Sequence, residues 1–146
     1  LLGHPMRALS VTLTALLLAS GVGSLLAKRV RSVGWVGFGV ALWVATAVAA
    51  LPTIEAVGQA APLTLRVLLA LSLILPLGLL LGIPFAWGLH RIGPERTPLA
   101  WAVNAFFTVI GAGLSVVLSM NLGFTMVWIL GAACYGVALG LGRFKA

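Results

Sequence analysis

Acidic residues are almost missing from this chain of 146 residues, which has two of them, both glutamates, against nine lysines and arginines. Charged residues of either sign make up only 8% of the chain, whereas hydrophobic residues make up 62%. Soluble domains carry roughly a quarter charged residues, so this composition excludes a soluble globular domain. The net charge of +7 is spread too thinly for a dense basic patch, and we expect no nucleic-acid partner.

Cysteine is also scarce. The single cysteine, Cys134, lies inside an apolar run. One cysteine forms neither a disulfide within the chain nor a thiolate metal site of its own. We therefore expect no metal centre.

What the chain does contain is a set of uncharged apolar stretches, at residues 8–27, 33–51, 67–89, 99–120 and 122–142. Each is close to the ~20 residues that a helix needs to cross ~30 Å of hydrocarbon. The stretches are continuously apolar, whereas a barrel strand would alternate over about ten residues. The sequence predicts an all-α fold: a polytopic membrane bundle of five transmembrane helices that forms one domain, residues 1–146, in the lipid bilayer.

Basic residues flank these stretches unevenly. Five antiparallel crossings leave Arg7 and Arg66 on one side and put the other seven basic residues on the opposite side. These seven are Lys28, Arg29, Arg31, Arg91, Arg96, Arg143 and Lys145. Basic residues favour the cytoplasmic side, so we expect a cytoplasmic carboxyl terminus and an external amino terminus. Headgroup binding by the first three is the alternative reading of this charge.

The connections between the stretches are short. The longest, residues 52–65, should lie along the outer interface, where we expect Glu55 to meet Arg66. Residues 120–123, with Asn121, should form a tight helical hairpin. The first stretch is longer than the 7 to 15 apolar residues of a signal-peptide core, so we expect a retained helix. A first residue other than Met suggests a longer reading frame or a trimmed sequence.

Small residues recur at every fourth position in four of the five stretches. Such ladders let helix backbones approach closely in lipid, where apolar burial gives no driving force between helices. They serve either packing within the chain or contact with partner subunits. The positions that we expect at helix–helix contacts are Ala19, Gly23, Gly78, Gly82, Gly111, Gly136 and Gly140.

The fourth stretch carries a polar stripe. Its spacings of 3 and 4 put one set of residues on a single helical face: Asn104, Thr108, Gly111, Ser115 and Ser119. An unpaired amide in hydrocarbon costs several kcal/mol, so Asn104 needs a partner. We expect hydrogen bonds to another helix, with a water or substrate pathway as the alternative.

Two prolines interrupt the third stretch, at Pro76 and Pro84. Each removes a bond within the helix and favours a kink that a neighbouring helix must compensate. No ionisable residue lies near them, which favours a structural kink over a transport site.

Catalytic constellations are absent, and we expect no enzyme activity. The predicted topology puts Glu55 and Glu95 on opposite sides of the membrane, so they cannot act as a pair. His4 and His90 are separated in the same way. Each is a weak candidate for an axial ligand of a pigment or haem, but we expect no cofactor.

Several segments resemble the membrane-spanning region of bacterial spermidine-synthase-like integral membrane proteins. They are residues 2–5 (LGHP), 17–26 (LLASGVGSLL), 76–85 (PLGLLLGIPF), 101–104 (WAVN) and 120–124 (MNLGF). Ala86 departs from the proline expected there. The resemblance implies the bacterial cytoplasmic membrane and, in the family, a soluble aminopropyltransferase-like domain. This chain has no aspartate and no nucleotide-binding unit, so the resemblance implies an architecture without the activity.

Three functions remain open. The first is a non-catalytic scaffold or accessory subunit of a larger membrane complex, whose partners are the bilayer and other membrane subunits. The second is part of a transport path for a small, polyamine-like solute, although no acidic residue lies inside the membrane to hold a cationic amine. The third is a pigment- or haem-bearing subunit of an energy-transducing complex.

Overall fold

The computed structural model describes residues 5–141, with side chains from residue 6 to residue 138. These residues form five α-helices and two short 3-10 helices, and no strand occurs among them. The α-helices are α1 (Pro5–Leu26), α2 (Gly34–Ala60), α3 (Leu63–Leu89), α4 (Thr97–Leu122) and α5 (Phe124–Leu141). The 3-10 helix η1 (Ala27–Arg29) follows α1, and η2 (Pro94–Arg96) precedes α4. The predicted all-α fold is confirmed.

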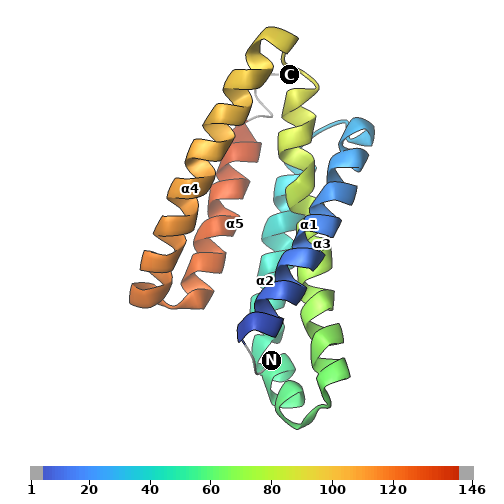
Figure 1. Cartoon of the computed structure of the whole chain (residues 1–146), viewed down its shortest axis with the longest axis vertical. Coiled ribbons are helices and arrows are strands. Elements are labelled where there is room, and N and C mark those ends of the chain that lie inside the picture. The colour runs from blue at the N-terminus through green and yellow to red at the C-terminus, as the bar shows by residue number, and fades with distance from the viewer. Residues whose placement is uncertain (1–4, 142–146) are drawn as a thin grey trace.

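Four of the helices, α1 to α4, are long and apolar enough to cross a membrane. Helix α5 is also apolar, but its described portion is shorter. Successive helices run in opposite directions along the bundle (Figure 1). The structure is therefore a helical bundle with four helices able to cross a membrane by length and composition, and a fifth crossing by α5 stays a prediction.

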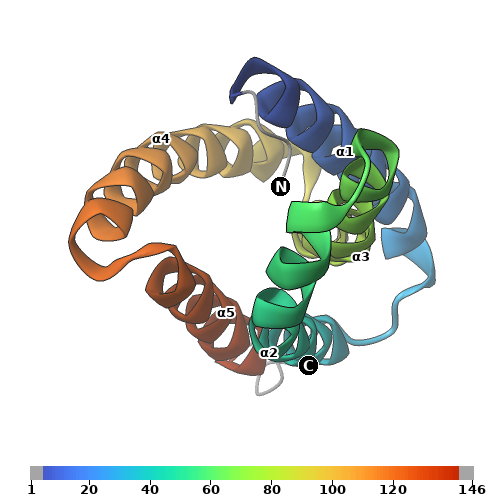
Figure 2. The same ribbon diagram turned by 90° about the horizontal axis from the view of Figure 1, so that it is seen from below.

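The helices are not neighbours in chain order. Helix α1 packs most closely on α3, α2 packs on α3 and α5, and α4 packs on α5. Viewed along the bundle, they follow one another round a ring in the order α1, α3, α2, α5, α4 (Figure 2). We call α1, α2 and α3 the compact part; α5 packs closely against its α2, and α4 contacts the bundle mainly through α5.

Helix α2 is longer than the sequence predicted. The expected connection at residues 52–65 is wrong, because the helix continues through Pro52 to Ala60 and only two residues separate it from α3. Arg66 donates to the carbonyl oxygens of Gln59 and Ala61, at 3.0 and 2.9 Å. Carbonyls at a helix end have no partner within the helix, so this guanidinium caps α2. The expected Glu55–Arg66 pair is therefore also wrong within the described chain.

The hairpin between α4 and α5 forms as predicted. Gly123 alone separates the two helices, and its amide donates to the carbonyl of Ser119 at 3.1 Å. Its φ of 80° is one that side chains with a Cβ rarely adopt, so glycine is required at this turn. Asn121 donates to the carbonyl of Val117 at 2.7 Å.

Candidate functional site

The closest contact in the chain joins α1 to α3 through small residues. In the second half of α1 one face is buried, at Ala15, Ala19 and Gly23, and Ala27 of η1 continues it. A Cβ on Gly23 would overlap the backbone carbonyl of Leu79, and one on Gly82 would overlap that of Ser20. A Cβ on Gly78 would lie 2.7 Å from the Cβ of Ala19. We call these contacts the α1–α3 seam, in which the two backbones lie in close contact.

The other glycines expected at helix contacts do not form such a seam. A Cβ added at Gly111 or Gly136 would have no atom within 4 Å. Neither position is therefore closely packed within the described chain, and contact with a partner subunit at either stays a prediction. Gly140 lies outside the residues whose side chains are described.

The buried face of α2 combines valines with small residues. Val36, Val40 and Val44 are buried together with Gly37 and Ala47, whereas Ala45 and Ala49 are exposed. The small residues of α2 are therefore buried at some positions only.

The polar stripe of α4 forms no hydrogen bond to another helix in the described chain. Its three hydroxyls bond to carbonyls one turn earlier in α4: Thr108 to Asn104 at 2.7 Å, Ser115 to Ala112 at 2.8 Å, and Ser119 to Val116 at 2.8 Å. The side-chain amide of Asn104 is exposed and has no partner among residues 6–138. The expectation of interhelical bonding is therefore wrong within the described chain, because no side chain or carbonyl of another helix bonds to Asn104 or to the three hydroxyls.

The polar stripe is nevertheless turned toward the bundle. Trp101, on the same face, packs edge-on against Phe85 of α3, with ring centroids 4.9 Å apart. At the other end of the face, Ser115 and Ser119 are half-buried beside α5. Between these two contacts, Asn104 and Thr108 are exposed. The polar stripe therefore contacts other helices near its two ends and is exposed in the middle.

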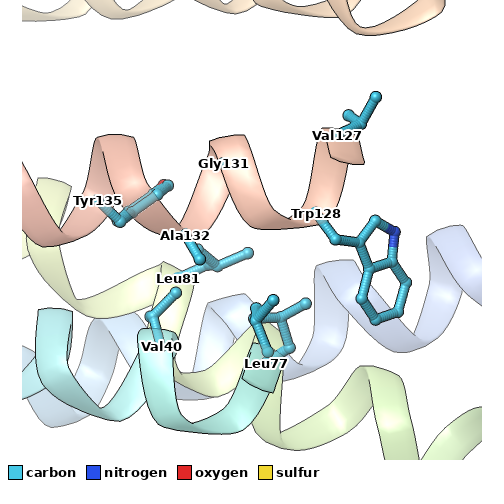
Figure 3. Close-up of a pocket in the computed structure, with 9 residues that line it drawn as sticks. Val40, Leu77, Leu81, Val127, Trp128, Gly131, Ala132 and Tyr135 are labelled. Atoms are coloured by element: carbon cyan, nitrogen blue, oxygen red, sulfur yellow. The ribbon is translucent and has the colours of Figure 1, made fainter. Parts of the chain in front are cut away.

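Two apolar cavities lie between α5 and the compact part. One, of about 430 Å³, is lined by Leu81, Pro84, Phe85, Cys134, Tyr135 and Ala138. The other, of about 170 Å³, lies between α2, α3 and α5 and shares Leu81 and Tyr135 with the first. Trp128 reaches from α5 toward α2 and α3 beside it (Figure 3). No charged side chain lines either cavity, so both suit apolar groups rather than ions.

Tryptophans make the two long-range side-chain hydrogen bonds of α3. The indole N–H of Trp43, on α2, donates to the carbonyl of Leu73 at 3.1 Å, in the turn before Pro76. Helix α3 continues through both of its prolines, and this bond ties the turn before Pro76 to a neighbouring helix. Sequence reasoning missed Trp43, which lies within an apolar stretch and gives no separate signal.

The second tryptophan lies at the end of the bundle that carries most of the charge. Trp87 donates to the carbonyl of Val30 at 3.0 Å, and the Arg91 guanidinium lies 3.5 Å above its ring. This contact fastens the η1–α2 connection to α3. The η1–α2 connection and η2 lie at the same end of the bundle (Figure 1), so the basic residues that they carry lie together.

The two histidines are not brought together as ligands. His90 is exposed at the end of α3, and His4 lies outside the described residues. No group of three or more potential metal ligands occurs in the part of the chain that the structure describes. Cys134 is exposed on α5.

These features define a class: an all-α bundle with four helices able to cross a membrane. Comparison with family models, curated proteins and solved structures finds no match for the chain. Its function is therefore argued from the arrangement of its own residues.

Proposed function

We propose that this protein is a non-catalytic integral membrane module that serves as a scaffold or accessory subunit of a larger membrane complex. The observation that supports the proposal is the state of α4, which has no buried residue although it is long and apolar enough to span the membrane. Helix α4 also carries the unpartnered amide of Asn104.

Lipid solvates the apolar side chains of α4 but not its polar ones. Acyl chains solvate its exposed leucines, valines and phenylalanines well. They offer no hydrogen bond to an amide, and an unsatisfied polar group in hydrocarbon costs several kcal/mol. A helix of another subunit supplies both the apolar contact and the hydrogen bond.

The proposed membrane is the bacterial cytoplasmic membrane, with the amino terminus outside and the carboxyl terminus inside. The support is the clustering of basic residues at one end of the bundle. The resemblance to spermidine-synthase-like membrane proteins contributes to this proposal the bacterial setting and an architecture, without the activity. A reporter fused after Ala146 should behave as cytoplasmic, and one inserted between Ala61 and Pro62 as external. The reverse pattern would overturn the proposed orientation.

Photo-cross-linking in native membranes tests the scaffold proposal. Phe107 on α4 is 63% exposed and Phe38 on α2 is 62% exposed, so a photoreactive phenylalanine fits each site equally well. We expect the probe at position 107 to form an adduct with one recurrent membrane protein, and the probe at position 38 to form none with it. Adducts with lipid alone, or with this chain alone, at position 107 would overturn the proposal.

The transport alternative has one observation in its favour. Asn104 and Thr108 form no bond to another helix in the described chain, and a cavity of about 430 Å³ lies between α3 and α5. Its apolar walls suit a cationic polyamine poorly. Spermidine uptake into vesicles containing the protein, compared with vesicles containing the Asn104→Leu variant, decides between the two. Uptake that the substitution abolishes would favour transport over the scaffold.

The pigment-bearing alternative depends on His4 and His90. A visible absorption spectrum of the chain purified from native membranes tests it directly. A Soret or pigment band that His90→Ala removes would establish this third function in place of the scaffold.

A further inference from the structure

We propose that the charged end of the bundle binds the phosphate headgroup of an anionic phospholipid through four residues, Lys28, Arg29, Arg31 and Arg91. We call these residues the basic cluster. The site does not involve α4 and goes beyond the proposed scaffold role. Its one premise is that this end of the bundle lies at a membrane surface.

A tryptophan joins the two parts of the basic cluster. The indole N–H of Trp87, on α3, donates to the carbonyl of Val30 at 3.0 Å. The guanidinium of Arg91 lies over the same indole, 3.5 Å from the ring centroid. Val30 stands between Arg29 and Arg31 in the chain. The indole therefore brings the cation that follows α3 next to the cations of the η1–α2 connection.

The basic cluster has no anionic partner in the described chain. All four side chains are exposed, and none forms an ion pair with a residue that the structure describes. Of the two acidic residues, Glu55 lies near the far end of α2, and Glu95 of η2 also has no ion pair among the described residues. Like charges held together repel one another, and a phosphate that accepts hydrogen bonds from arginine and lysine relieves this repulsion.

A role in orientation alone does not account for this arrangement. The topological signal requires basic residues on one side of the membrane and sets no geometry for them. It does not require that Arg91 pack on an indole or that the same indole hold the connection. A guanidinium over a ring face keeps its N–H donors, and Arg91 uses none of its side-chain donors within the described chain. These donors suit the oxygens of a phosphate.

Apolar side chains beside the basic cluster identify a lipid as the source of the phosphate. Leu25, one turn before Lys28, is 76% exposed, and Phe38, two turns after Arg31, is 62% exposed. Tryptophans such as Trp87 are typical of the membrane–water interface. A phospholipid has the same order of groups, with a phosphate at the surface and acyl chains below it. A soluble phosphate has no part that fits the apolar side chains.

Native mass spectrometry of the protein in detergent tests the site, because it resolves individual bound lipids. We expect phosphatidylglycerol to bind more tightly than phosphatidylcholine with the same acyl chains. Arg91→Gln should weaken binding of phosphatidylglycerol by about 5-fold, the contribution of one basic residue near an anionic surface. Arg96→Gln is the matched control, since Arg96 is an exposed cation at the same end and outside the basic cluster. It should change the affinity by less than about 2-fold. Equal losses, or no preference for phosphatidylglycerol, would overturn the inference.

A second variant tests the placement of the charges rather than their number. Trp87→Phe keeps every charge but removes the bond to the Val30 carbonyl, and should weaken binding of phosphatidylglycerol by about 2-fold or more. Trp43→Phe is the control, because it removes a similar bond of 3.1 Å away from the basic cluster. It should leave the affinity unchanged. Circular dichroism checks that both variants are folded. Unchanged affinity in a folded Trp87→Phe variant would overturn the inference.

Thermal unfolding distinguishes a lipid from a soluble phosphate. Phosphatidylglycerol should raise the unfolding temperature relative to phosphatidylcholine, because a ligand that binds the folded state stabilises it. Inorganic phosphate should not raise it above the value in chloride at equal ionic strength. Equal stabilisation by inorganic phosphate would overturn the lipid assignment. None of these measurements depends on the cross-link at position 107, so the lipid site and the scaffold fail separately.

Discussion

The α1–α3 seam and the α4–α5 hairpin contain the same kind of sequence and behave differently. Both have small residues at every fourth position or close to it, and both are strongly apolar. In the seam, a Cβ added at Gly23 or Gly82 would overlap the backbone of the opposite helix, whereas one added at Gly111 or Gly136 would have no atom within 4 Å. A small-residue ladder therefore permits a contact but does not create one, because the contact needs a complementary ladder on a helix held in register.

The two pairs of helices are held in different ways. Helices α1 and α3 run parallel and are held at one end by Trp87, which bonds to Val30 in the connection that follows α1. Helix α4 is fixed to α5 by the turn at Gly123 and to α3 by the contact of Trp101 with Phe85. Its middle has no such constraint, and that leaves it open to a partner.

Glycine substitutions should give the largest difference in stability between the seam and the hairpin. Gly82→Leu should lower the free energy of unfolding by about 3 kcal/mol or more, because its Cβ would overlap the Ser20 carbonyl and force α1 away from α3. Gly136→Leu is the matched control and should change it by less than about 0.5 kcal/mol. Thermal unfolding in detergent measures both. Equal losses would show that α5 is packed as tightly as the seam.

The proline turn of α3 allows a second, smaller test. Trp43→Phe removes the bond to the Leu73 carbonyl but keeps most of the apolar volume, and should cost about 1 kcal/mol. Trp128→Phe is the control, since its indole has no hydrogen bond to the described residues. The difference between the two variants in chemical denaturation isolates the bond. A larger loss for Trp128→Phe would mean that packing around the cavity of about 170 Å³ contributes more to stability than the Trp43 hydrogen bond does.

A third test separates two roles of Arg66: the cap on α2 that the structure shows, and the pair with Glu55 that the sequence suggested. Arg66→Met should destabilise the chain by about 1 kcal/mol, because the carbonyls of Gln59 and Ala61 lose their donor. Glu55→Gln should have no measurable effect, because Glu55 has no ion pair in the described chain. Thermal shift assays at two ionic strengths compare these variants. A salt-sensitive loss in Glu55→Gln would restore the expected ion pair.

The sequence predicted the helical class, four of the spans and the turn at residues 120–123, because these depend on local composition and on a glycine with positive φ. It failed at residues 52–60, which we expected in a connection because the apolar stretch ends at residue 51, although these residues remain helical. It also failed at Asn104, because a need for a hydrogen bond does not identify who supplies it. Trp43 was missed because an indole donor within an apolar run resembles any other hydrophobic residue.

The smallest expected effect concerns Asn104 in the isolated chain and separates a contact within the chain from one between chains. If its amide bonded to a neighbouring helix of the same chain, Asn104→Leu would lower stability by about 0.6 to 1.7 kcal/mol. The structure gives it no such bond, so the monomer should lose less than about 0.3 kcal/mol in dilute detergent. Thr108→Val, which removes only a bond to the preceding turn, is the reference for a local effect of this size. The measurement is unfolding at decreasing protein-to-detergent ratio. A loss that stays constant on dilution belongs to the monomer and contradicts the open face, whereas one that fades on dilution belongs to an assembly.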